Sequence, residues 1–189
     1  MNNIATTMQD TPVRDRLLEA AGRLFYKEGV RAVGIDRVLA EAGAAKASLY
    51  SNFGCKDELV AAYVAHRSES ARQAIDNYVT DTPPAKRALR FFDFLVDWIG
   101  SDDFRGCPMQ LVVGELPDAS HPARRLAAEH REWLVGRLAE WATAAGAAHP
   151  KRIAGVLLVL FDGAVAASLQ DGPQRASEAR WAAERLLAA

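Results

Sequence analysis

The sequence contains too few cysteines for a disulfide-stabilised fold. Cys55 and Cys107 are the two cysteines among 189 residues, and two thiols cannot build the framework that small secreted proteins use. Runs of β-branched residues are absent, alanine is common and half of the residues are hydrophobic, which predicts an all-α protein with a substantial core. The net charge is −1, so overall charge does not drive binding to nucleic acids or to anionic membranes.

Motifs for catalysis and for metal binding are also missing. The sequence has no glycine-rich phosphate loop, no nucleophile elbow and no paired-carboxylate motif. His66, His121, His130 and His149 lack the HExxH spacing or any other metal spacing, and we interpret them as surface or pocket-lining side chains. We therefore predict that the protein is not an enzyme and that it uses no metal and no cofactor.

One stretch, residues 153–169, approaches the composition of a membrane span. It is interrupted by Asp162, Gly163 and Ser168, which makes it too short and too polar for a span. A helix that is apolar nearly all round is instead buried in a core or an interface. No charged-then-apolar leader opens the chain, so we expect a cytoplasmic protein without membrane contact.

Residues 34–53 contain two short helical patterns separated by a tight turn. The first pattern has one apolar face, made by Ile35, Val38, Leu39 and Ala42. Gly43 follows at a position where helices commonly end in the left-handed conformation. In the second pattern, Leu49 and Phe53 lie one turn apart and face the same way. Two short helices with this connection predict a helix-turn-helix, which is a DNA-binding motif.

The second helix of this motif presents polar side chains if Leu49 and Phe53 face the core. Lys46 lies at the N-terminal end, which enters the major groove first. Lysine donates hydrogen bonds to guanine, serine pairs with either kind of base edge, and alanine contacts the thymine methyl group. Tyr50 and Lys56 are suited to phosphates. The predicted DNA-binding residues are Lys46, Ala47, Ser48, Tyr50, Ser51, Asn52 and Lys56. The alternative is a plain helical hairpin whose polar face is solvated.

The sequence around the motif favours the first interpretation. Residues 49–59 follow the pattern Leu-Tyr-x-x-Phe-x-x-Lys-x-x-Leu, and Gly29 closes a preceding amphipathic helix. Residues 11–65 thereby resemble the DNA-binding domain of the tetracycline-repressor (TetR) family of bacterial regulators. The resemblance implies DNA contacts by Lys46, Ser48, Tyr50, Asn52 and Lys56. The chain departs from the family pattern at Gly34, Leu39 and Ala45, which affects the local geometry and not the expected fold.

The resemblance also implies an all-α homodimer with a C-terminal ligand-binding domain. We expect about nine helices in all. The chain should divide into a flexible arm (1–10), a three-helix helix-turn-helix head (11–55) and a helical ligand-binding and dimerisation body (56–189). The predicted function is ligand-responsive transcriptional regulation, with a repressor released from a palindromic operator in double-stranded DNA by a small apolar effector.

Two regions of the body are assigned to partners. Residues of about 150–187 combine the most apolar stretch with an alanine-rich helix, and we expect the homodimer to form through them. The candidate ligand pocket consists of Phe94, Trp98, Cys107, Met109, Trp133, Phe161 and Asp162. These aromatic residues also suit a plain core, and Asp162 suits either a structural hydrogen bond or an anchor for the ligand.

Cys107 supplies an alternative function. It follows Arg105 and lies at a predicted helix start, and both features lower the pKa of a thiol and favour reactivity. The alternatives to the ligand-responsive repressor are therefore a redox- or electrophile-sensing regulator acting through Cys107, and a small-molecule-binding protein with weak DNA binding.

Overall fold

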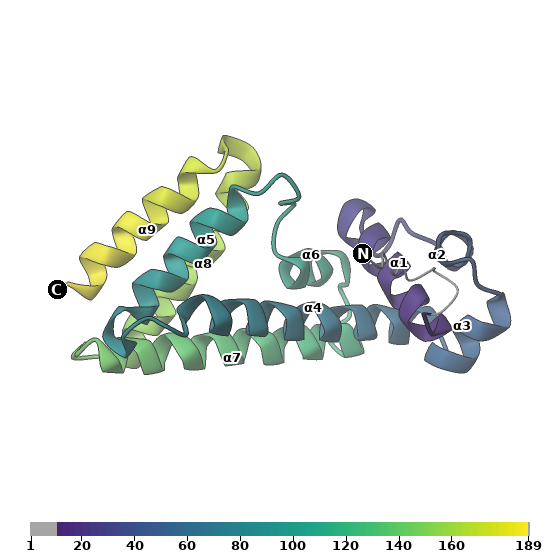
Figure 1. Cartoon of the computed structure of the whole chain (residues 1–189), viewed down its shortest axis with the longest axis horizontal. Helices are drawn as coiled ribbons and strands as arrows, with labels where there is room; N and C mark the ends of the chain where they lie inside the picture. The colour runs from purple at the N-terminus through teal and green to yellow at the C-terminus, as the bar shows by residue number, and fades with distance from the viewer. Residues whose placement is uncertain (1–10, 189) are drawn as a thin grey trace, which may run out of the picture. The chain divides into compact units, whose positions relative to one another are not determined.

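The computed structural model describes residues 11–188, so the predicted arm at 1–10 lies outside the described residues. Within 11–188 the chain forms nine α-helices, one 3-10 turn and no strand, which confirms the all-α prediction (Figure 1). The helices are α1 (Val13–Glu28), α2 (Ile35–Ala42), α3 (Lys46–Phe53), α4 (Lys56–Val79), α5 (Arg87–Ile99), α6 (Pro108–Glu115), α7 (Pro122–Ala144), α8 (Pro150–Asp171) and α9 (Gln174–Leu187).

The chain divides into two compact units. The first comprises the residues up to Arg67 together with Pro108–Ala127, and the second comprises Ser68–Cys107 and the residues from Ala128 onward. Helices α4 and α7 each contribute residues to both units, so two of the three boundaries fall inside helices, and the third falls between Cys107 and Pro108 at the start of α6. The functional division between residues 55 and 56 therefore remains a prediction.

Helices α1, α2 and α3 contact one another in the first unit. The apolar stripe of α1 is buried at Leu17, Ala21, Leu24 and Phe25, as its spacing predicts. A Thr-Pro pair is typical of a cap followed by the first helical residue, but α1 starts one residue later. Pro12 is itself the cap residue, because its ψ of 140° is extended and helical geometry begins only at Val13.

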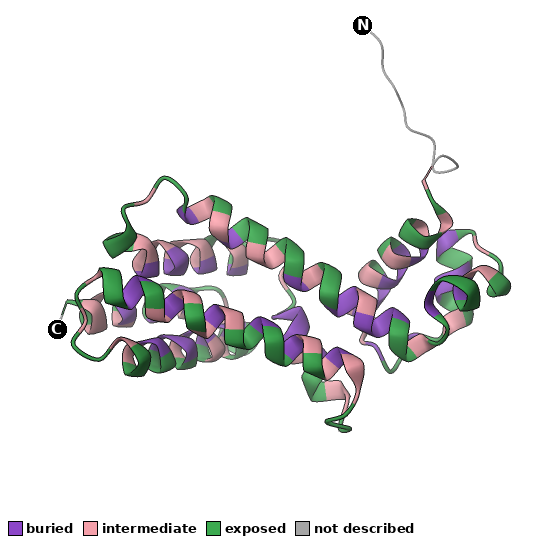
Figure 2. Cartoon of the chain, turned by 90° about the horizontal axis from the view of Figure 1, so that it is seen from below, coloured by how far each residue is buried: buried purple, intermediate pink, exposed green. Residues whose placement is uncertain are grey.

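Helices α5, α8 and α9 contact one another in the second unit. On α5 the buried residues are Ala88, Phe91, Phe92, Leu95 and Ile99. Helix α9 buries small residues, Ala176, Ala179 and Ala183, which permit its close approach to neighbouring helices. Figure 2 shows the buried residues of the chain in purple. Helix α5 thus packs against both α8 and α9.

Helix α8 is, within the described residues, the one helix long and apolar enough to cross a membrane. That criterion concerns length and composition alone, and the core helix of a soluble protein also meets it. The helix buries Leu157, Leu158, Phe161 and Val165 in the second unit and leaves other apolar side chains exposed. Its apolar character therefore serves packing on one face and leaves another face uncovered.

Candidate functional site

The turn between α2 and α3 has the geometry that its sequence predicts. Gly43 adopts the left-handed conformation, with φ 57° and ψ 42°, and its N–H is donated to Ala40 O at 3.3 Å. The N–H of Ala44 is donated to Leu39 O at 3.0 Å, so two carbonyl groups at the end of α2 are satisfied. Helix α3 begins without a side-chain cap, because Ala45 has no side-chain acceptor. The turn is therefore held mainly by the backbone.

The two faces of α3 are divided as predicted. Leu49 and Phe53 are buried against the first unit. Tyr50 is 45% exposed, which leaves a large aromatic ring in solvent on the face where the polar residues lie. The other exposed residues of this face are Lys46, Ala47, Ser51 and Asn52, while Ser48 is half-buried. The helix thus presents one continuous surface of short polar side chains beside one lysine and one tyrosine.

Three of these side chains already have partners within the protein. Lys46 Nζ lies 3.8 Å from Asp36 Oδ1, in a pair whose side chains are both well exposed. Ser51 Oγ and Asn52 Nδ2 donate hydrogen bonds to Ser48 O at 3.1 and 2.7 Å. Exposed pairs of this kind are weak, so the side chains can exchange these partners for a nucleic acid at small cost. Asp36, whose carboxylate lies beside Lys46 on the exposed face of α3, was not among the predicted residues.

An ion pair and a cation–π contact also stabilise the three-helix head. Arg37 of α2 donates two hydrogen bonds to the carboxylate of Glu28 at the end of α1, one of them at 2.7 Å. Arg14 of α1 lies over the Phe53 ring of α3, 5.1 Å from its centroid. These contacts join α1 to the two helices of the motif. Sequence reasoning missed them because the partners have no characteristic spacing.

In the second unit, the predicted pocket residues fall into separate groups. Phe94 packs against Trp98, with 6.5 Å between ring centroids, and against Phe91, with 6.4 Å. Phe91 in turn contacts Phe161, with 5.9 Å between centroids. Phe91 therefore lies between Phe94 and Phe161, and Trp98 joins this group through Phe94. Cys107 is buried in the same unit, whereas Met109 belongs to the first unit.

Asp162 has a partner on the neighbouring helix α7. Both of its carboxylate oxygens accept hydrogen bonds from Arg131, at 3.1 and 2.6 Å. This hydrogen bonding holds the pKa of Arg131 above its usual value, and nearby Cys107 adds a smaller electrostatic contribution. Asp162 thus has the hydrogen-bonding partner that a structural role requires, and this partner, Arg131, was not predicted.

A second polar pair lies in the core beside Trp133. His130 is 6% exposed, and its Nδ1 lies 2.9 Å from Ser68 Oγ. Burial lowers the pKa of His130 to about 4, with repulsion from the Arg72 guanidinium as the second cause. His130 is therefore not a surface histidine, and its partner is Ser68 in the core. The spacing of the sequence could not reveal this, because Ser68 is 62 residues away.

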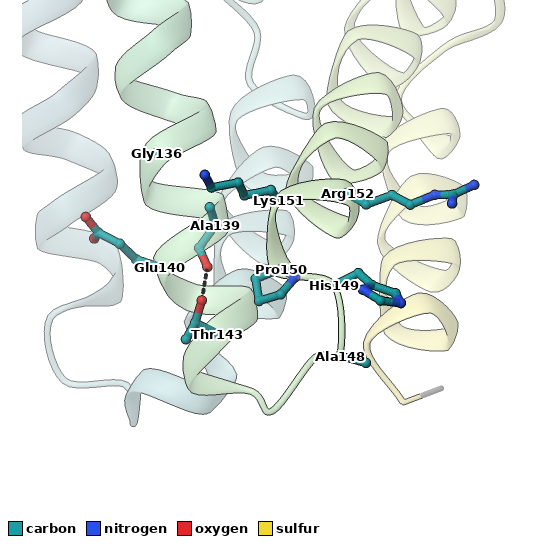
Figure 3. A pocket seen from close by; sticks show the side chains of 9 residues that line it. All are labelled: Gly136, Ala139, Glu140, Thr143, Ala148, His149, Pro150, Lys151 and Arg152. Carbon is teal, nitrogen blue, oxygen red and sulfur yellow. Dashed lines mark hydrogen bonds between the residues drawn. The ribbon is translucent and has the colours of Figure 1, made fainter.

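A surface hollow of about 710 Å³ lies where α7 ends and α8 begins (Figure 3). Its lining includes Glu140, Thr143, His149, Lys151 and Arg152, and Thr143 Oγ1 donates to Ala139 O at 2.8 Å within it. None of the seven predicted pocket residues lines this hollow. Within the described residues, no group of three or more His, Cys, Asp or Glu side chains is arranged to hold a metal ion.

Comparison with known proteins gives the family. Residues 17–63 match the model of the bacterial regulatory proteins of the tetR family. The crystal structure of SCO4454, a TetR-family transcriptional regulator from Streptomyces coelicolor, is 33% identical and has a TM-score of 0.88 over 93% of this chain and 94% of that one. The chain belongs to the TetR family.

Two further relatives agree with this assignment. A TetR-type regulator from Streptomyces avermitilis is 32% identical, with a TM-score of 0.80 over 92% of this chain and 99% of that one. The transcriptional regulator LmrA of Bacillus subtilis is 34% identical over 124 residues, which cover 64% of this chain and 66% of LmrA. The chain thus aligns with slightly less than two thirds of LmrA. As a TetR-family protein it is a DNA-binding transcriptional regulator of the helix-turn-helix type.

Proposed function

We propose that this TetR-family protein is a repressor that binds a palindromic operator through α3 and is released by a small apolar effector. The exposed face of α3 is the observation that carries the proposal. A helix of eight residues keeps Leu49 and Phe53 buried while Tyr50 stays 45% exposed among short polar side chains. An exposed aromatic ring beside serine, asparagine and lysine suits the edges and phosphates of a DNA groove.

In this proposal each of the predicted DNA-binding residues has a task set by its chemistry. Lys46, released from Asp36, donates to a guanine edge or to a phosphate. Ser48, Ser51 and Asn52 pair with base edges, and Ala47 contacts a thymine methyl group. Tyr50 and Lys56 bind phosphates and fix the position of the helix on the duplex.

The homodimer is proposed to form through α8 and α9. Val159 on α8 is 65% exposed and Trp181 on α9 is 62% exposed, and both lie within the predicted interface of residues 150–187. Exposed apolar side chains on neighbouring helices favour a second apolar surface as their partner. A two-fold dimer presents its two α3 helices about 34–36 Å apart, which requires a nearly palindromic operator.

The effector is proposed to bind the second unit near its aromatic residues. Phe94 and Trp98 are half-buried and stacked, so an apolar molecule can cover rings that the protein itself only partly covers. The effector releases the operator only if it binds the DNA-incompetent state more tightly, since equal affinity for both states shifts nothing. We infer that the protein has no catalytic activity. We also infer that it is located in the cytoplasm, as expected for a bacterial transcriptional regulator.

The test begins with selection of a duplex from a random DNA pool by the wild-type protein. Lys46→Ala and Tyr50→Ala should each weaken binding to the selected duplex, by about 1–3 kcal/mol for a base contact. Loss of a phosphate contact should in addition reduce the slope of log K against log salt by about 1. Lys86→Ala, which removes an exposed lysine of the 3-10 turn Pro84–Lys86 in the second unit, is the matched control. Equal affinity for Lys46→Ala, Tyr50→Ala and wild type would exclude α3 as the DNA-reading element.

A redox-sensing regulator acting through Cys107 is the second candidate. The observation in its favour is the electrostatic interaction between Cys107 and Arg131, because a neighbouring cation stabilises a thiolate. Cys107 is buried, so small oxidants reach it more readily than bulky electrophiles. Operator release by peroxide in the wild type, abolished in Cys107→Ser and retained in Cys55→Ser, would support this candidate over the apolar effector.

A further inference from the structure

The last residue of α6 holds the turn that follows α1. Glu115 Oε2 accepts a hydrogen bond from the backbone N–H of Arg31 at 2.9 Å, although the two residues are 84 positions apart. Gly29 lies beneath the same carboxylate, where an added Cβ would stand 2.8 Å from both of its oxygens. Gly29 also has φ +93°, which favours glycine. The turn and the carboxylate therefore fit together closely within the first unit.

A second contact joins the same region to the start of α4. His121 Nδ1 accepts the N–H of Ala123 at 3.1 Å, which leaves the proton of a neutral ring on Nε2. That Nε2 lies 3.5 Å from Asp57 Oδ1, in the first turn of α4 and one residue after Lys56. The segment from Glu115 to His121 thus contacts the turn after α1 and, separately, the start of α4.

The segment between these contacts is itself held in place. Asp118 Oδ1 accepts hydrogen bonds from the N–H and the hydroxyl of Ser120, at 2.8 and 2.7 Å, and these bonds lower the pKa of Asp118. Arg124 Nη1 donates to Leu116 O at 2.7 Å across the connection from α6 to α7. These hydrogen bonds hold the connection from α6 to α7 in one conformation, so the end of α6 that carries Glu115 is fixed in position.

The turn that Glu115 holds determines where the reading helix lies. It joins α1 to α2, and Arg37 of α2 is bonded back to Glu28 at the end of α1. Helix α3 follows α2 through the backbone-held turn at Gly43. We propose that Glu115 is a positioning residue for DNA binding, which fixes the orientation of α2 and α3 relative to α1 through the Arg31 amide. This inference rests on the proposed reading of DNA by α3.

Simple electrostatics makes the opposite prediction, which gives the test its direction. Removing a negative charge from a DNA-binding unit should strengthen attraction to phosphates, so Glu115→Ala and Glu115→Gln should both tighten binding. If Glu115 acts through its hydrogen bond, Glu115→Ala should weaken binding to the selected duplex by about 5-fold or more, a typical coupling between sites. Glu115→Gln keeps an acceptor for the Arg31 amide and should stay close to wild type.

Glu132→Ala is the matched control, because it removes an exposed glutamate of α7 in the second unit. Weakening by Glu115→Ala alone, with the slope against salt unchanged, supports the positioning role. Tighter or unchanged binding by Glu115→Ala, or equal weakening by Glu115→Gln or Glu132→Ala, overturns it.

Hydrogen exchange separates this inference from the proposed function, since it needs no DNA. The amide of Arg31 should exchange slowly in wild type and Glu115→Gln, and faster in Glu115→Ala. Unchanged exchange in Glu115→Ala overturns the inference whatever the DNA result. If the wild-type protein selects no duplex but its Arg31 amide is protected from exchange, α3 does not read DNA and Glu115 has no positioning role. The hydrogen bond between Glu115 and the Arg31 amide is still supported in that case.

Discussion

Helices α3 and α8 both leave side chains in solvent, but their exposed chemistry is opposite. The exposed face of α3 has serines, an asparagine, a lysine and Tyr50, whereas α8 exposes Val156, Val159 and Leu169. A polar face with a lysine suits a charged and hydrogen-bonding partner, and an aliphatic face suits another aliphatic surface. The exposed side chains of α3 and α8 therefore suit different kinds of partner.

The largest effect should come from placing a charge on the exposed face of α8. If Val159 is buried in a homodimer, Val159→Asp leaves an unpaired charge in the interface, which costs about 3–5 kcal/mol. Sedimentation should then show a monomer at concentrations where the wild type is dimeric, and operator binding should fall with it. Val113→Asp, on an exposed valine of α6, is the control and should remain dimeric. A dimeric Val159→Asp protein would show that α8 faces solvent in the functional state.

The next effect contrasts two neighbouring residues of α3. Leu49 is fully buried, so Leu49→Ala should reduce the free energy of unfolding by about 2–5 kcal/mol. Tyr50→Ala should change the free energy of unfolding by no more than about 0.5 kcal/mol, because the ring is exposed, while operator affinity falls. Urea titration measures stability and fluorescence anisotropy measures DNA binding. A large loss of stability in Tyr50→Ala would assign Tyr50 to the core and not to DNA.

A smaller effect concerns acid pH and the buried His130. Its pKa of about 4 in the folded state lies below the ordinary value of 6.5, so the unfolded chain takes up the proton first as pH falls. The contribution to stability is complete above pH 6.5 and is lost progressively as pH falls towards 4, and at pH 5 the loss is about 2 kcal/mol.

The measurement is the difference in unfolding free energy between pH 7 and pH 5. His130→Gln should remove about this much of the pH dependence. Identical pH dependence in wild type and His130→Gln would mean that His130 is not held neutral by the fold.

The smallest effect is expected at the Arg131–Asp162 pair. Both side chains are partly exposed, so a double-mutant cycle with Arg131→Met and Asp162→Asn should give a coupling of less than about 1 kcal/mol. If Asp162 is structural, Asp162→Asn should leave effector affinity unchanged once an effector is known. A selective loss of effector affinity would restore the alternative in which Asp162 anchors the ligand.

The sequence predicted those features that depend on local periodicity. The helices α2 and α3 and the left-handed Gly43 follow from hydrophobic spacing and from the conformational freedom of glycine. The apolar stretch identified in the sequence covers residues 153–169, and α8 extends beyond it to Pro150, because proline is well tolerated in the first turn. Local rules thus gave the elements, with errors of a few residues at their ends.

Pairings between distant residues were not predictable from the sequence. Glu115 meets the Arg31 amide across 84 residues, and Ser68 meets His130 across 62. No local spacing specifies which polar groups meet in the folded chain, since tertiary packing decides it. For the same reason the predicted pocket residues could be listed by type, but their arrangement around Phe91 could not be predicted.

The most direct test of the account is a hydroxyl-radical footprint of the wild-type protein on its selected duplex. If α3 reads DNA and α8 pairs two copies, the footprint should show two symmetric protected patches with centres one helical turn, about 10–10.5 base pairs, or a multiple of it apart. Both patches should fade together in Lys46→Ala. A single asymmetric patch, or an unchanged footprint in Lys46→Ala, would contradict the account.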